Sequence, residues 1–410
     1  MKSKKTDKIS IFTIFLLFSL VSTYLYLNYN TNIDFKSSSQ ESIEAFDNLK
    51  HSNQWTLPNI YITNWSIANK THDWVIYEDG YYIIENVSIT GINGIYGIHI
   101  ENTTESFIIR NCRINEGVQL LRAESGELIN NTIYLFYEEF IHKNGISLDF
   151  CSNIIIGDNR LDDVYDENYY FIHGFLISRS KNITIKENTL SIIGNSTFPE
   201  PKGISVESSS NIEIINNTIC GFEIGIDLDR DITECTVIEN QIYNSQRNGL
   251  FVTGNNHTIS KNIVKNSRVG VLFFASNSML FDNKISEVES GIRTYNAYNN
   301  IIDSNSIQHV SEYGIHAEES NLNNITNNII QNAGEVGIYL DFCHYNLIIG
   351  NYIAYNLRCI VEEINCYENI ISDNVCIELL DIPGYYPLLI LGILIVITFI
   401  FINFKIKGEN

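Results

Sequence analysis

HGFLISRSKNITIKENTLSI, residues 173–192, is one unit of a repeat that fills most of this chain. The unit reads glycine–apolar–x–apolar, then a short polar stretch, an Ile-rich segment, and Asn-x-apolar. Three short segments alternate apolar with polar residues, and none of them shows a 3.6-residue period. We therefore predict three β-strands separated by turns, and no helix, in each unit.

The unit recurs about every 22 residues from Gly97 to Ile377, a spacing typical of solenoids. This period predicts an all-β fold, a right-handed parallel β-helix of about 12 rungs whose strands stack about 4.8 Å apart. In each Gly-x-x-x-x segment the first and third x residues should point inward and the second and fourth outward. The units begin at Gly97, Gly117, Gly145, Gly174, Gly203, Gly225, Gly249, Gly270, Gly291, Gly314 and Gly337, with Cys359 in the next place.

Asparagines recur with the same period. We expect each to bond the asparagine of the rungs above and below, and to adopt the left-handed backbone conformation of a tight turn. The glycine should permit the sharp corner before the next strand. The predicted structural ladder comprises Asn188, Asn217, Asn240, Asn262, Asn283, Asn305, Asn328, Asn351 and Asn374.

Both ends of the chain predict a membrane location. Uncharged apolar runs at residues 9–27 and 388–404 are each flanked on their outer side by lysines. The first run could be an uncleaved anchor or a signal peptide that is removed, and the second is long enough to span a bilayer together with the residues before it. The positive-inside rule then places both termini in the cytoplasm and the middle outside the cell.

This pattern divides the chain into six segments. They are a basic tip and first membrane segment (1–30), a polar stalk (31–52), an N-terminal cap (53–96), the β-helix (97–381), a transmembrane helix (382–404) and a cytoplasmic tail (405–410). The net charge of −22 argues against binding nucleic acid or an anionic membrane surface.

The eight cysteines test the register. Cys343 and Cys366 lie eight residues before successive ladder asparagines, so they occupy one column on adjacent rungs. We predict a disulfide or a close thiol pair between them. A metal site formed with His344 is the alternative. The other cysteines do not align in pairs and read as core residues.

Tyr81–Ile89, Gly97–Asn102 and Phe107–Cys112 (YYIIENVSI, GIHIEN and FIIRNC) lead into the repeats. Residues 60–377 resemble archaeal surface proteins of the NosD-type, carbohydrate-binding and sugar-hydrolase-like β-helix superfamily. That resemblance implies a lyase, a hydrolase, an epimerase, a copper-delivery protein or a protein without a reaction. For copper, the 2 methionines and 9 scattered histidines offer no cluster of soft ligands.

Outward-facing carboxylates are the candidate chemical groups. Glu207, Asp227 and Asp229 are the catalytic candidates, because adjacent carboxylates raise one pKa and suit an acid–base pair. Simple exposure to water is the alternative reading. Stacked acids also suit Ca²⁺, and its candidate ligands are Glu318, Asp341 and Glu363.

Three successive glycine spacings of 28, 29 and 29 residues from Gly117 to Gly203 predict long loops that stack beside the polar face. Aromatic rings beside carboxyl groups suit sugar rings, although the rings could simply pack against each other. The candidate ligand-binding residues are Tyr165, Tyr169, Tyr170, Phe171, Asp149, Asp162 and Asp163.

The sequence therefore predicts a membrane-anchored extracellular β-helix that binds glycans or a surface partner. The alternatives are a structural or adhesive rod, a polysaccharide lyase, hydrolase or epimerase, and NosD-like copper handling. The sequence does not define an oligomeric state.

Overall fold

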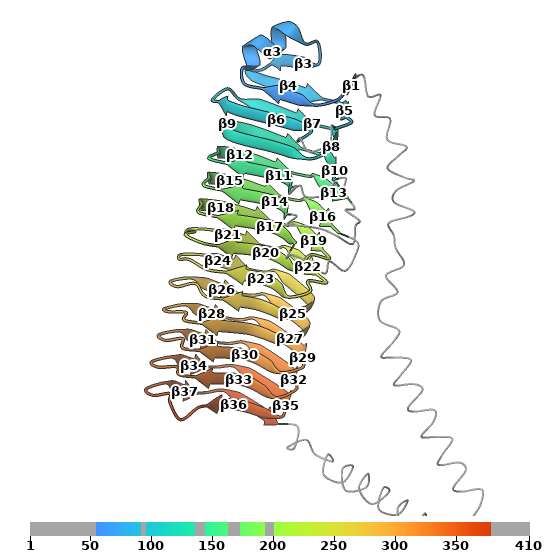
Figure 1. Ribbon diagram of the computed structural model, residues 1–410. Helices are drawn as coiled ribbons and strands as arrows, with labels where there is room; N and C mark the ends of the chain where they lie inside the picture. Colours follow the sequence, from blue (N-terminus) through green and yellow to red (C-terminus); the bar gives the residue numbers. More distant parts are fainter. Residues whose placement is uncertain (1–54, 92–95, 136–143, 163–172, 193–200, 379–410) are drawn as a thin grey trace, which may run out of the picture. The chain divides into compact units, whose positions relative to one another are not determined.

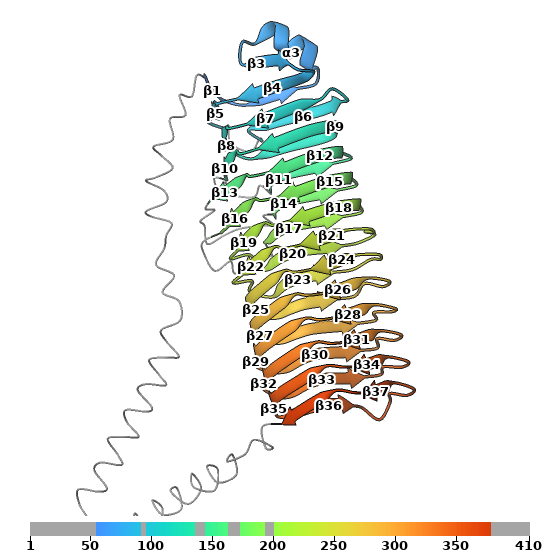
Figure 2. The same cartoon turned by 180° about the vertical axis from the view of Figure 1, so that it is seen from behind.

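The computed structural model describes residues 55–91, 96–135, 144–162, 173–192 and 201–378, which all belong to one compact unit, Asn53–Asn410. Its strands stack rung upon rung as an elongated parallel β-helix (Figures 1 and 2). Three columns of strands run along it, which we call the first, second and third columns.

The first column carries the Gly-x-x-x-x segments. It contains β2 (Ile60–Ile62), β6 (Ile98–Thr103), β9 (Val118–Ile129), β11 (Asn144–Asp149), β14 (His173–Ser178), β17 (Lys202–Glu207), β20 (Ile224–Asp229), β23 (Asn248–Val252), β25 (Ile263–Phe273), β27 (Lys284–Tyr295), β30 (Tyr313–Glu318), β33 (Val336–Asp341) and β36 (Arg358–Glu362). β9 continues into the second column, and β25 and β27 begin in the third.

The second column precedes the ladder asparagines. It contains β4 (Tyr81–Glu85), β7 (Phe107–Arg110), β12 (Ser152–Gly157), β15 (Lys181–Lys186), β18 (Ser210–Ile215), β21 (Thr236–Ile238), β24 (Thr258–Ser260), β26 (Met279–Phe281), β28 (Ile301–Asp303), β31 (Asn324–Thr326), β34 (Leu347–Ile349) and β37 (Ile370–Ser372).

The third column follows the ladder asparagines. It contains β1 (Trp55–Leu57), β5 (Val87–Ile89), β8 (Arg113–Asn115), β10 (Thr132–Tyr134), β13 (Arg160–Asp162), β16 (Thr189–Ser191), β19 (Thr218–Cys220), β22 (Gln241–Tyr243), β29 (Ser306–Val310), β32 (Ile329–Ala333), β35 (Tyr352–Asn356) and β38 (Val375–Glu378).

The parallel stacking and its register are confirmed. In β20 and β23, Ile226 lies opposite Leu250, as the 24-residue offset between Gly225 and Gly249 requires. Inward residues such as Ile226 and Leu228 are fully buried. One continuous apolar core therefore runs between the three columns, and the outward residues of the first column are free to carry chemistry.

The asparagine ladder is also present. Asn262 donates its side-chain N–H to Val237 O at 2.8 Å and to Asn283 Oδ1 at 3.0 Å. Its Oδ1 accepts both the backbone and side-chain N–H groups of Asn240, each at 3.0 Å. Every polar atom of this buried side chain thus bonds a neighbouring rung.

Two details of the predicted turn are wrong. The left-handed conformation falls on the residue before each ladder asparagine, for example Lys261 with φ 56° and Asn216 with φ 52°. Gly225 has no positive φ and is required for space instead. A Cβ there would lie 2.3 Å from Ile242 Cγ2 and 2.6 Å from Gly249 O.

A second asparagine ladder, not predicted from the sequence, runs along the β-helix. Asn300, Asn323, Asn346 and Asn369 repeat the same bonds at the turn between the first and second columns. Earlier rungs place Ser278 and His257 in this column. Because the residue type changes along it, this column shows no simple sequence repeat.

The predicted cap joins the rod through aromatic packing. α3 (Trp65–Thr71) begins after Asn64, whose side chain accepts a hydrogen bond from Ile67 N at 2.9 Å. β3 (Val75–Glu78) pairs antiparallel with β4. The buried Trp65 ring stacks on Phe107 at 5.3 Å between centroids, which covers the first rungs.

Of the two arrangements predicted for Cys343 and Cys366, the structure has the close thiol pair and not the disulfide. Cys343 and Cys366 lie together but remain thiols, with Cys343 N donating to Cys366 Sγ at 3.3 Å. In-register side chains point in parallel, so the Cys343 thiol faces Ala317 O and not the other sulfur. The disulfide joins Cys359 to Cys376 instead, across one rung with α-carbons 5.8 Å apart.

Among the described residues, no helix is long and apolar enough to cross a bilayer. Both predicted membrane segments lie outside those residues, so they stay predictions.

We predict that Asn262→Ala lowers the free energy of unfolding by roughly 1–3 kcal/mol for each buried donor that it orphans. Asn240 would lose the acceptor for its backbone and side-chain N–H groups. Asn255→Ala is the control, since the Asn255 side chain is exposed and is not part of the ladder. Urea unfolding of both variants measures the difference, and equal losses would contradict a buried ladder.

Candidate functional site

Acidic side chains form a line on the outward face of the first column. Asp149, Ser178, Glu207 and Asp229 end β11, β14, β17 and β20 and are register partners in turn. We call these four residues the acidic column. All four are partly exposed, so sequence spacing did predict a continuous polar line along the axis of the β-helix.

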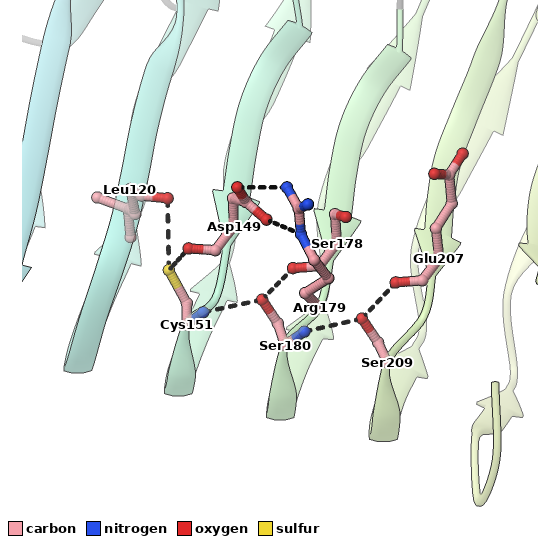
Figure 3. A network of polar contacts seen from close by, with 8 residues as sticks. All are labelled: Leu120, Asp149, Cys151, Ser178, Arg179, Ser180, Glu207 and Ser209. Carbon is pink, nitrogen blue, oxygen red and sulfur yellow. Dashed lines mark hydrogen bonds and ion pairs between the residues drawn. The ribbon is translucent and has the colours of Figure 1, made fainter. Parts of the chain in front are cut away.

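An arginine anchors one end of this line. Arg179 donates from Nε and Nη2 to the two carboxylate oxygens of Asp149 at 2.7 and 2.6 Å. Figure 3 shows that the guanidinium reaches back across one rung to do so, while the Glu207 carboxylate extends away from it. Arg179 therefore fixes the Asp149 carboxylate, Asp229 forms an ion pair with Arg230 at 3.5 Å, and Glu207 is left for other partners.

Beside the acidic column lies a buried polar group that we call the buried centre. It consists of Lys202, Ser205 and Asp227. Ser205 and Asp227 are register partners on β17 and β20, and both occupy outward positions between fully buried inward neighbours. Yet their exposed fractions are 0% and 1%.

The three residues of the buried centre differ in their polar partners. Lys202 Nζ forms an ion pair with Asp227 Oδ2. Ser205 Oγ is buried without a hydrogen-bond partner among the described atoms. Burial of a hydroxyl without a partner costs roughly 1–3 kcal/mol, so such a group needs an explanation.

The electrostatics of the buried centre favour proton exchange near neutrality. Burial raises the pKa of Asp227 to about 6. The ammonium of Lys202 opposes this rise, and the negative charges of Asp229 and Glu207 add to it. A carboxyl group that exchanges its proton near pH 6 suits a general acid or a switchable hydrogen-bond donor.

The structure separates the predicted ligand-binding residues. Asp149 is in the acidic column, but Asp162 ends β13 in the third column and pairs with Arg160. Tyr165, Tyr169, Tyr170, Phe171 and Asp163 lie outside the described residues, so their role stays a prediction.

The predicted calcium ligands line up without forming a cluster. Glu318 and Asp341 are register partners, and burial followed by the charges of Glu318 and Glu363 raises the pKa of Asp341. However, Arg293 occupies Glu318 at 3.2 Å, and Tyr339 donates its hydroxyl to Glu363 at 2.8 Å. Within the described part of the chain, no group of three His, Cys, Asp or Glu residues is placed to hold a metal ion.

Sequence reasoning missed Lys202 and Ser205. Lys202 precedes a repeat glycine, a position filled by Ile224 and Asn248 in the next rungs. A lysine before that glycine and an aspartate in the following Gly-x-x-x-x segment is a charge pair across rungs, which was the available signal.

Comparisons with known proteins agree with this architecture. The family described as right-handed β-helix region matches residues 48–198, 202–340 and 283–381. The chain belongs to this family. A search of curated proteins finds no match.

Solved structures resemble this β-helix at low sequence identity. A periplasmic alginate epimerase, AlgG, shares 12% identity and a TM-score of 0.53, over 77% of this chain and 84% of that one. An exopolygalacturonase from Thermotoga maritima shares 11% identity and a TM-score of 0.40, over 73% and 83%. At these identities the likeness shows the fold alone.

We predict that the stability of this β-helix falls as the pH rises from about 4 to about 6. The native state keeps the proton of Asp227 to a higher pH than the unfolded chain, whose carboxyl titrates near 3.8. Asp227 alone would contribute at most roughly 3 kcal/mol to this fall.

Urea unfolding between pH 4 and 7 measures this predicted fall in the free energy of unfolding. Asp227→Asn should flatten the profile in this window, whereas Asp149→Asn, the control from the exposed acidic column, should keep the fall. An unchanged profile in Asp227→Asn would contradict the buried carboxyl.

Proposed function

We propose that this β-helix binds a polysaccharide along the outward face of its first column, at the buried centre and the acidic column. The observation that carries this is the unpartnered hydroxyl of Ser205, buried on an outward face next to the Asp227–Lys202 ion pair. An unsatisfied buried group calls for an explanation. Ser205 is 0% exposed in the unbound protein, so in our proposal the atoms that cover it move aside and a hydroxyl group of the ligand supplies the missing hydrogen bond.

The carboxylates of the acidic column favour a hydroxyl-rich polymer as the ligand. The carboxylates of Glu207 and Asp229 accept hydrogen bonds, and sugar hydroxyls donate them. Successive rungs offer these acceptors about 4.8 Å apart, so a polymer with repeated hydroxyl groups can bond several rungs at once. Nucleic acid does not suit this face, because its phosphates would meet carboxylates.

We propose that this binding takes place at the outer surface of the cell. The predicted membrane segments at residues 9–27 and 388–404 would hold the β-helix at the outer surface of the cell, where it meets glycans. This placement rests on the two apolar runs and their flanking lysines.

We predict that Ser205→Ala weakens polysaccharide binding roughly 2- to 10-fold, the worth of one hydrogen bond, without lowering stability. The variant removes a buried hydroxyl that has no partner in the unbound protein. Isothermal titration of the full chain with soluble polysaccharides measures binding, and thermal unfolding measures stability.

Ser320→Ala is the matched control. Ser320 is equally buried, but its hydroxyl donates to Glu318 O at 2.8 Å. This variant should lose stability and keep its affinity. Failure of the full chain to bind any polysaccharide would overturn the proposed function.

A second candidate function is hydrolysis of the bound glycan. Asp227, with its pKa raised to about 6, would be the general acid, and Asp229 would act beside it. The two residues face outward two positions apart on one strand, which places their α-carbons about 6–7 Å apart. Glycosidases use two carboxyl groups, one of them an acid with a raised pKa, and the raised pKa of Asp227 is the observation that favours this candidate.

In that case, the release of reducing ends from a bound polysaccharide should fall as the pH rises above about 6, because Asp227 loses its proton. Asp227→Asn should abolish the release, and Asp149→Asn should preserve it. A reducing-end assay of the full chain checks this, and binding without any release would leave a binding protein.

A further inference from the structure

Aromatic side chains continue the first column beyond the buried centre. The register partner of Asp227 on the next strand is Phe251. From there, partly exposed rings follow one another along the outward face as far as β33. We call this set the aromatic stripe, and it consists of Phe251, Phe274, Tyr295, Tyr313, His316 and Tyr339.

The rings form two contacting groups. Phe274 lies between Phe251 and Tyr295, with ring centroids 5.5 and 5.6 Å apart. Further along, His316 lies 4.9 Å from Tyr313 and 5.0 Å from Tyr339. The rings within each group are tilted or edge-on, so neighbouring rings do not cover each other's faces fully.

Polar groups fill the space between and beyond the rings. Arg293 and Glu318 form an ion pair between the two groups, since Arg293 is the register partner of His316 and Glu318 that of Tyr295. Burial and the neighbouring Glu363 raise the pKa of Tyr339 to about 12, so its phenol stays protonated. His316 Nε2 is buried without a hydrogen-bond partner among the described atoms.

These features match the two sides of a sugar ring. Its C–H face packs on an aromatic ring, and its hydroxyl groups seek polar atoms at the rim. We propose that the aromatic stripe is a binding track for a linear, uncharged polysaccharide that runs along the axis of the β-helix and continues into the buried centre. This inference rests on the proposed function and names its class of ligand.

Charge selects an uncharged chain over a uronate. The carboxylates of Glu318, Glu319, Asp341 and Glu363 surround the tyrosines of the stripe. The cation within it, Arg293, is already bound to Glu318. At the rim, the positive charge of Arg358 lowers the pKa of Tyr313, but the negative charges of Glu312 and Glu335 raise it. A polymer with a carboxylate on every sugar would therefore meet like charge along the track.

The test uses the full chain and ligands of two lengths. A trisaccharide should need only the buried centre, whereas a long polymer should gain affinity from the stripe. For a neutral polymer, we expect Tyr295→Ala to weaken binding roughly 3- to 10-fold and to leave trisaccharide binding unchanged. Tyr295→Phe should retain the wild-type affinity, because it keeps the ring.

Tyr298→Ala is the control. Tyr298 is a 41% exposed tyrosine three residues away, in the turn after β27, and its loss should not change affinity. Thermal unfolding of each variant separates a loss of ligand contact from a loss of folding.

Alginate and polygalacturonate should bind at least tenfold more weakly than a neutral polymer of equal length. Equal affinities of Tyr295→Ala and wild type for the neutral polymer, or tighter binding of either uronate, would overturn the track. If glycan binding then still responds to Ser205→Ala, the proposed function survives without it.

Discussion

The in-register stacking of successive rungs, held by buried asparagines, is the constraint on which the rest of the structure depends. Each ladder asparagine bonds the rung before it and the rung after it, as Asn262 does with Asn240 and Asn283. A one-residue slip would break these bonds and turn every inward isoleucine outward. The ladder therefore fixes the direction of each side chain in the three columns.

Fixed register turns a repeat position into a straight line on the surface. Glu207 and Asp229 meet because they hold the same place in two units, and so do Arg293 and His316. A substitution at one place in one unit changes one step of such a line and leaves the core unchanged. The buried centre and the aromatic stripe are consecutive stretches of the same outward face, and their chemistry is independent of the packing beneath them.

The period was enough to predict the columns, since it aligns residues that hold equivalent places. The period could not predict contacts between residues that occupy different positions in the repeat unit. Lys202 reaches Asp227 diagonally from a different position in the unit, and Cys359 bonds Cys376 across one rung. It also could not show direction within a column, which is why Cys343 and Cys366 lie adjacent without bonding.

Fold and charge lead to different expectations for the ligand. The architecture shared with an alginate epimerase reflects the stacking of rungs. That stacking does not restrict which residues occupy the outward face. The face itself is acidic, and the arginines on it are committed, Arg179 to Asp149 and Arg293 to Glu318. Each pairing orients one carboxylate and removes one free positive charge. Lines of carboxylates repel one another, and hydroxyl groups offer them hydrogen bonds without adding charge. The ligand chemistry therefore follows from the outward side chains and not from the coil that carries them.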